Sequence, residues 1–178
     1  MDNISIKKID ENILKVIWQI GYTKECPEWS KWNGPYYQSY KKYNSYEEFK
    51  SSNIAKFMLS SNVRCICLGD EVVGVITRYW EDPITLWLEI GILIYDEKYW
   101  GSGIGSAAIK AWTTETFNEF KNIEHIGLTT WSGNVRMMKL AEKVGFKKEA
   151  QIRKVRFWQG VYYDSVKYGV LREEWNER

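Results

Sequence analysis

The sequence predicts one domain of the α/β class, in which helices flank a mixed (α+β) sheet. Segments with the apolar patterns of strands are interleaved with segments whose apolar residues recur at helical spacing. The connections near residues 69–70 and 82–83 are too short for a crossover, so the strands that they join are antiparallel neighbours. A chain of 178 residues can bury a sizeable core but is short for two full domains. We therefore expect residues 1–178 to form a single domain.

The first sixty residues are expected to form a strand, two helices and an aromatic loop between the helices. Residues 3–9 have the pattern of a strand, and residues 11–20 place their isoleucines and valine on one side of a helix. Ser45 followed by Glu48 has the spacing of a capping box, which predicts a second helix that continues to about Ser60.

The remaining elements alternate between extended and helical patterns. Gly145 follows an apolar helical pattern at the place where a left-handed residue ends a helix. A Gln159-Gly160 turn joins the last two extended segments into a hairpin. The predicted order is strands 63–68, 72–80 and 84–95, helix 103–120, strand 123–131, helix 134–144, and strands 146–158 and 161–171.

Aromatic residues are unusually frequent, at 16% of the chain, and many lie between Tyr22 and Tyr46. They fit two interpretations. Aromatic rings fill cores and half-buried sheet faces, and a loop rich in rigid rings can also form a wall over a ligand pocket. The residues concerned are Tyr22, Trp29, Trp32, Tyr36, Tyr37, Tyr40 and Tyr43.

Charge and targeting patterns exclude several classes of function. The 25 Lys and Arg residues against 23 Asp and Glu residues give a net charge of +2, which is too small to indicate a nucleic-acid partner. The N-terminus has no basic segment leading into an apolar one, and no apolar run is long enough to span a bilayer. We expect a cytoplasmic protein with no membrane partner, either a monomer or a homodimer.

Cysteine and histidine are too sparse to indicate a metal centre. The cysteines, Cys26, Cys65 and Cys67, are odd in number, and the chain is too large to need a disulfide framework, which fits a reducing compartment. Cys65 and Cys67 are two residues apart in an expected strand, so buried thiols are favoured over metal ligands. His125 is the only histidine, and we expect no metal.

The most informative segment is the glycine-rich stretch 99–108, which lies between a predicted strand and a predicted helix. Glycines there allow a sharp turn that presents consecutive N–H groups, and the start of the helix adds a positive dipole end. This geometry suits a phosphate, although glycines also shape tight turns with no ligand. A P-loop is excluded because no Lys follows Gly105. The preceding antiparallel strands argue against a dinucleotide fold.

The motif Trp100-Gly101-Ser102-Gly103-Ile104-Gly105 resembles the signature of the GNAT superfamily of acyl-CoA-dependent N-acyltransferases. That signature reads Arg or Gln, two residues, Gly, one residue, then Gly or Ala. Trp100 departs from it, as is common in the similar branch of ribosomal-protein N-terminal alanine acetyltransferases. Further similar motifs are Glu89-Ile90-Gly91, Asn134 at a helix start, 142–146 and 168–175.

The resemblance covers residues 72–175 most specifically and implies both a fold and a cofactor. The fold is a mixed, mostly antiparallel sheet with helices on both faces and a splay between strands 84–95 and 123–131. The co-substrate is acetyl-CoA, with its pyrophosphate at the glycine turn and its pantetheine arm along the end of strand 84–95. Asn134 would contact that arm, cap its helix, or do both. The implied cofactor-binding residues are Ile92, Leu93, Ile94, Tyr95, Trp100, Gly101, Ser102, Gly103, Ile104, Gly105, Ser106 and Asn134.

The resemblance also implies direct transfer of an acetyl group to a primary amine. Backbone N–H groups near Leu93 and Ile94 would polarise the thioester carbonyl. Glu89 shares one strand face with Leu93, so its carboxylate is the candidate base, with a structural or solvated glutamate as the alternative. His125 titrates near neutrality but stands at the start of its strand, away from the splay.

The general acid and the acceptor are not identified by this resemblance. Met137 and Ala141 stand where related proteins often carry a Ser or a Tyr, and neither can donate a proton. The acceptor is either a small-molecule amine or a protein N-terminus, bound by the aromatic loop and by Tyr162 and Tyr163 of the last hairpin. The alternative function is a non-catalytic acyl-CoA-binding or regulatory module.

Overall fold

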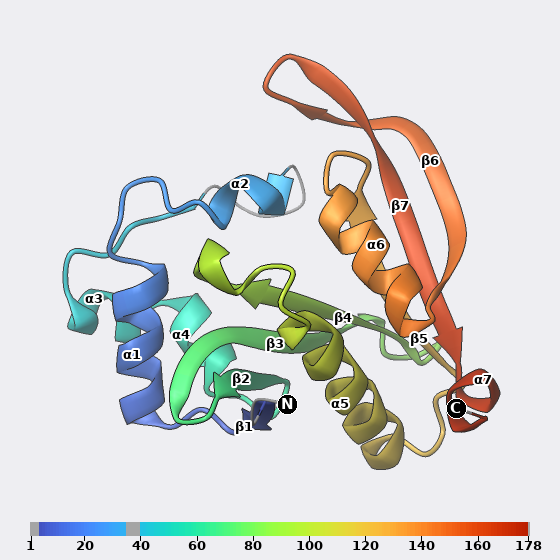
Figure 1. The fold of residues 1–178 in the computed structure, drawn as a ribbon, viewed down its shortest axis with the longest axis horizontal. Helices are drawn as coiled ribbons and strands as arrows, with labels where there is room; N and C mark the ends of the chain where they lie inside the picture. The colour runs from blue at the N-terminus through green and yellow to red at the C-terminus, as the bar shows by residue number, and fades with distance from the viewer. Residues whose placement is uncertain (1–3, 35–39, 178) are drawn as a thin grey trace. The chain divides into compact units, whose positions relative to one another are not determined.

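The computed structural model describes residues 4–34 and 40–177. Within them, seven strands form one mixed sheet in the order β1-β2-β3-β4-β5-β7-β6, with helices along the sheet, as the α/β expectation requires (Figure 1). The strands are β1 (Ile4–Lys7), β2 (Val63–Leu68), β3 (Glu71–Asp82), β4 (Trp87–Ile94), β5 (His125–Trp131), β6 (Lys147–Trp158) and β7 (Val161–Leu171). The helices are α1 (Glu11–Gly21), α2 (Ser30–Asn33), α3 (Tyr46–Lys50), α4 (Asn53–Met58), α5 (Ile104–Glu119), α6 (Val135–Val144) and α7 (Arg172–Asn176), with a 3-10 turn η2 (Glu97–Tyr99).

These elements fall into two compact units. The first holds the described residues of 4–31, 40–77 and 92–108, and the second those of 32–34, 78–91 and 109–177. The strands β3 and β4 and the helix α5 pass from one unit into the other.

The first unit is built on an aromatic core. Tyr22 packs its ring against those of Phe49, Tyr43 and Trp29, with centroids 5.0, 6.2 and 5.6 Å away. All four are buried, together with Tyr95 at the end of β4. The core-filling interpretation is therefore confirmed for Tyr22, Trp29 and Tyr43, whereas Tyr36 and Tyr37 lie outside the described residues.

The predicted helix from Ser45 to Ser60 is wrong in one respect, because it is two helices. Ser45 caps α3 by accepting a hydrogen bond from the Glu48 N–H (3.2 Å), as its spacing predicts. Ser52 then caps α4 by accepting from the Ala55 N–H (3.2 Å). A serine that caps a new helix in this way has an extended backbone, which ends the preceding helix. The sequence analysis also missed α2, η2 and α7.

The second unit is built around β5, β6 and β7. β5 and β7 are antiparallel, with Gly127 opposite Gly169 and Thr129 opposite Lys167. The hairpin of β6 and β7, orange to red in Figure 1, has α6 beside it. β4 pairs with β5 in parallel at Leu88 with Ile126 and Glu89 with Gly127, which makes the sheet mixed.

The cysteines are free thiols, and Cys65 and Cys67 are buried as expected. Burial, and then the neighbouring Cys67, raise the pKa of the Cys65 thiol to about 12. Among residues 4–34 and 40–177, no cluster of His, Cys, Asp and Glu side chains is arranged to hold a metal ion. No helix in the same part of the chain has the length and apolar character needed to cross a membrane.

The C-cap of α6 provides a test of the backbone conformation. Gly145 has φ of 95°, and its N–H donates to the carbonyls of Ala141 and Glu142. We expect Gly145→Ala to lower the free energy of unfolding by roughly 1–2 kcal/mol, because a Cβ is strained in this region. Gly145→Asn is the matched control and should cost less, since Asn tolerates the left-handed conformation. Equal denaturation midpoints for Ala and Gly would contradict this assignment.

Candidate active site

The glycine-rich segment forms an open turn at the start of α5. Gly101 and Gly103 have φ of 78° and 93°, and a Cβ built on either would meet no atom within 4 Å. The turn leads directly into Ile104, so the first-turn N–H groups of α5 have no intrahelical partner. The turn therefore has the backbone freedom, the space and the donors that an anion site needs.

Trp100, the departure from the family signature, anchors this turn to β4. Its indole Nε1 donates to the carbonyl oxygen of Ile94 over 3.0 Å, and its backbone N–H donates to that of Glu97 over 2.9 Å. The ring packs, partly buried, against the aromatic core of the first unit. An apolar ring with one donor thus fixes the turn where the signature has Arg or Gln.

The end of β4 is held closely against β3. The Tyr95 N–H donates to the Val73 carbonyl (3.0 Å), and a Cβ on Gly74 would overlap the Leu93 carbonyl. The side chain of Tyr95 belongs to the core, where burial raises the pKa of its hydroxyl well above the ordinary range. The Tyr95 side chain is therefore unavailable to a ligand, whereas Ile92, Leu93 and Ile94 are partly exposed.

Glu89 is the centre of a polar network in the second unit. Its side chain is 2% exposed. Its Oε1 accepts hydrogen bonds from Thr129 Oγ1 (2.9 Å) and Lys167 Nζ (3.1 Å), and its Oε2 accepts from the Tyr79 hydroxyl (3.0 Å). Lys167 Nζ also donates to Thr129 Oγ1 (3.0 Å) and lies 4.9 Å from the centre of the Trp87 ring. This network compensates the buried charge, as a buried carboxylate requires.

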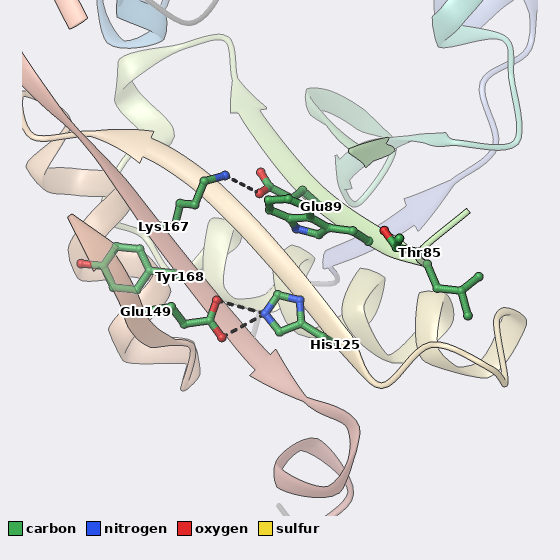
Figure 2. Close-up of a pocket in the computed structure, with 8 residues that line it drawn as sticks. Thr85, Glu89, His125, Glu149, Lys167 and Tyr168 are labelled. Carbon is green, nitrogen blue, oxygen red and sulfur yellow. Dashed lines mark hydrogen bonds and ion pairs between the residues drawn. The ribbon is translucent and has the colours of Figure 1, made fainter. Parts of the chain in front are cut away.

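Two opposed glycines accommodate the side chains that lie beside this network. Gly127 and Gly169 are partners on β5 and β7, on the face that carries Glu89 and Lys167. A Cβ on Gly127 would lie 3.1 Å from Glu89 Cγ, and a Cβ on Gly169 would overlap the His125 ring and Glu149. An open pocket of about 310 Å³ lies beside these side chains (Figure 2). Its lining residues are Thr85, Leu86, Trp87, Glu89, His125, Glu149, Lys167 and Tyr168.

His125 pairs with Glu149 and not with Glu89. Its Nε2 lies 3.0 Å from Glu149 Oε1, and Figure 2 shows the two side chains facing one another at one end of the pocket. Glu149 is the extra residue of a β-bulge in β6, because Lys148 and Ala150 pair with the consecutive residues Tyr168 and Lys167. His125 is the first residue of β5, as the sequence predicts.

Asn134 is the N-cap of α6. Its Oδ1 accepts from the Met137 N–H (3.1 Å), and its Nδ2 donates to the Trp32 carbonyl (3.1 Å), which also accepts from Trp131 Nε1. The capping role considered from the sequence is therefore confirmed. Met137 contributes only its backbone to this cap, and Ala141 is fully buried, so neither offers a proton.

The partners of Glu89 were not predicted from the sequence. Thr129, Lys167 and Tyr79 stand on three other strands, up to 78 residues away in the chain. The alternation of side chains along a strand could have shown that Thr129 shares a face with Gly127, and that Lys167 shares a face with Gly169. The strand register that brings Thr129 and Lys167 to Glu89 could not be predicted from the sequence.

Comparisons with known proteins identify the family. A family model described as an acetyltransferase (GNAT) domain matches residues 14–147. The chain belongs to the GNAT acetyltransferase family. The resemblance carried by the glycine-rich motif is thereby confirmed.

Two curated relatives from Bacillus subtilis (strain 168) are similar over part of the chain. One is an SPβ prophage-derived uncharacterized N-acetyltransferase, YokL, 37% identical over 44% of this chain and 44% of its own length. The other, YdaF, is named provisionally as a ribosomal N-acetyltransferase and is 29% identical over 57% of this chain and 55% of its own length. The chain thus spans about half the length of the curated relatives it matches.

Solved structures share the fold of this GNAT protein. A GNAT-family acetyltransferase from Bacillus anthracis superposes with a TM-score of 0.75 and 22% identity, over 98% of both chains. The Vibrio cholerae spermidine N-acetyltransferase, solved in complex with CoA and spermine, gives a TM-score of 0.72 and 17% identity over 97% of this chain and 98% of that one. At these identities the likeness shows the fold alone.

The Glu89 network can be tested without altering its charge. We expect Tyr79→Phe to lower the free energy of unfolding by about 1.5–3 kcal/mol, because the buried carboxylate loses a hydroxyl donor. Tyr162→Phe, at a ring that is 61% exposed, is the matched control and should stay within about 0.5 kcal/mol. Urea denaturation measures both, and equal effects would show that the Tyr79 hydroxyl contributes nothing to the network.

Proposed function

We propose that this GNAT protein is an N-acetyltransferase that transfers an acetyl group from acetyl-CoA to a primary amine. Membership of the family supports the reaction type, and the open glycine turn at the start of α5 is the observation that carries the cofactor assignment. The acceptor is a small-molecule amine or a protein N-terminus.

The glycine turn is the proposed site of the acetyl-CoA pyrophosphate. Positive φ at Gly101 and Gly103 directs the backbone of the turn, and the space above both glycines allows close approach of phosphate oxygens. The proposed donors are the backbone N–H groups of Gly101, Ser102, Gly103, Ile104, Gly105 and Ser106, with Trp100 holding the turn in place. The backbone of Ile92–Tyr95 is proposed to contact the pantetheine arm.

Glu89 is the proposed base. When bound, acetyl-CoA supplies a thioester that an amine attacks only in its neutral form. The carboxylate of Glu89 accepts the proton of the incoming ammonium, directly or through water. Its partners Thr129, Tyr79 and Lys167 hold both oxygens in a fixed orientation, which supports a positioned proton acceptor.

The proton for the departing thiolate is proposed to come from solvent. Met137 and Ala141 cannot supply it, and burial raises the pKa of the Tyr95 hydroxyl. The Tyr168 hydroxyl donates to Glu142 (2.9 Å) and has a pKa raised to about 12, chiefly by burial. Met137 and Ala141, which stand where related proteins often carry a Ser or a Tyr, also favour the second candidate, a non-catalytic acyl-CoA-binding module.

The cofactor assignment is tested by Gly103→Ala. An alanine is strained at φ of 93° by roughly 1–2 kcal/mol, so the turn shifts and acetyl-CoA affinity falls about tenfold. Gly160→Ala is the matched control, because Gly160 has φ of 82° and equally open surroundings in the β6–β7 turn. Calorimetric titration should show weaker binding of acetyl-CoA to Gly103→Ala and unchanged binding to Gly160→Ala. Unchanged affinity would remove the turn from the cofactor site.

The base is tested by Glu89→Gln. We expect the transfer rate to fall by about 10²–10⁴, the contribution of a positioned base, with little change in acetyl-CoA affinity. Glu81→Gln, at an exposed residue of β3, is the control and should retain wild-type rates. Thiol release with a library of primary amines, followed by mass spectrometry of the products, measures the rate and identifies the acceptor. Binding of acetyl-CoA with no transfer to any amine would favour the non-catalytic module.

A further inference from the structure

Lys167 is held in the way that a substrate amine would be held. Its Nζ lies 3.1 Å from Glu89 Oε1, 3.0 Å from Thr129 Oγ1 and 4.9 Å from the centre of the Trp87 ring. Figure 2 shows its side chain extending along the pocket toward Glu89. A primary amine of this chain is therefore in direct contact with the carboxylate proposed to accept the proton of the acceptor.

Open space adjoins this amine. The side chain of Lys167 is 26% exposed while that of Glu89 is 2% exposed, and both line the pocket of about 310 Å³. Gly127 and Gly169 carry no side chain, which leaves room on the same face for Glu89, His125 and Glu149. A lysine that served only to neutralise a buried carboxylate would need no free volume beside its ammonium, whereas an amine that receives an acyl group does.

We propose that Lys167 is an internal acceptor, whose Nζ receives the acetyl group from acetyl-CoA within the same molecule. This inference rests on the proposed function, because it requires acetyl-CoA as donor and Glu89 as base.

The transfer balances with groups already named. The Lys167 ammonium loses a proton to the Glu89 carboxylate, and the neutral amine forms a bond to the thioester carbonyl carbon. The C–S bond breaks, and CoA leaves as a thiolate that takes up one proton to become the thiol. The nitrogen loses a second proton to solvent, and Glu89 then releases the first proton to solvent as well. One ammonium and one thioester thus give one amide, one thiol and one proton.

Acetylation changes the network around Glu89. The amide retains one N–H donor but carries no charge, so the ion pair with Glu89 and the cation contact with the Trp87 ring are lost. Glu89 keeps its hydrogen bonds from Thr129 and Tyr79. Modification of Lys167 thereby removes the internal cation that compensates the buried charge of Glu89.

The test incubates the full chain with acetyl-CoA and no added amine, followed by tryptic mass spectrometry. Acetylated Lys167 resists trypsin, so modification yields peptide 157–172 with one acetyl group in place of 157–167. We expect Lys167 to be acetylated at least about tenfold faster than the exposed Lys121, at a rate independent of protein concentration. Glu89→Gln should slow this by about a hundredfold or more, the low end of general-base catalysis, and Glu81→Gln should not.

Three results would overturn the inference. These are an unmodified Lys167, a Lys167 that reacts no faster than Lys121, and a rate that rises in proportion to protein concentration. Should Glu89→Gln fail to fold, the acetylation of Lys167 relative to Lys121 is compared between native and urea-unfolded wild type. Only the native chain should acetylate Lys167 faster than Lys121. Thiol release with added amines is measured in parallel. Transfer to these amines while Lys167 stays unmodified would rule out this inference alone. No transfer to any amine, together with no binding of acetyl-CoA, would rule out the proposed function as well.

Discussion

The buried carboxylate of Glu89 is the constraint around which the second unit is organised. A charge with almost no exposure to water is tolerated only when donors and a cation surround it. Those donors come from β3, β5 and β7, through Tyr79, Thr129 and Lys167. The register of these strands must therefore bring all of them to one point, and a slip of one residue would turn Thr129 or Lys167 to the opposite face.

The same constraint explains the pocket. Glu89, His125 and Glu149 crowd one face of the sheet, and the room for them comes from Gly127 and Gly169, which face one another on adjacent strands. The β-bulge at Glu149 directs its carboxylate to His125. The packing of Glu89, His125 and Glu149 on this face thus depends on two residues that carry no side chain.

Much of this arrangement was predictable from local sequence, and the failures have physical reasons. Gly145 in the left-handed conformation, the Ser45 cap and the alternation of strand faces follow from rules that act within a few residues. The break between α3 and α4 was missed because Ser52 also caps a helix, and a continuous apolar pattern hides such a competition.

The partners of Glu89 could not be predicted because they depend on register across strands. Thr129 is 40 residues away and Lys167 is 78, and no local pattern fixes which residues of β5 and β7 come to lie opposite β4. Lys167 reads in the sequence as an ordinary charged residue of a hairpin. The conformation of the glycine turn, in contrast, was predictable from the sequence, because positive φ depends on glycines within one short segment.

A double-mutant cycle of stability tests whether the contact with Lys167 holds Glu89 as a charge. Glu89→Gln, Lys167→Met and the double variant would be compared with the wild type by urea denaturation. The account predicts that the double variant loses less stability than the sum of the single variants, by about 0.5–3 kcal/mol, because each single change leaves the other group without its partner. Additive losses would contradict it.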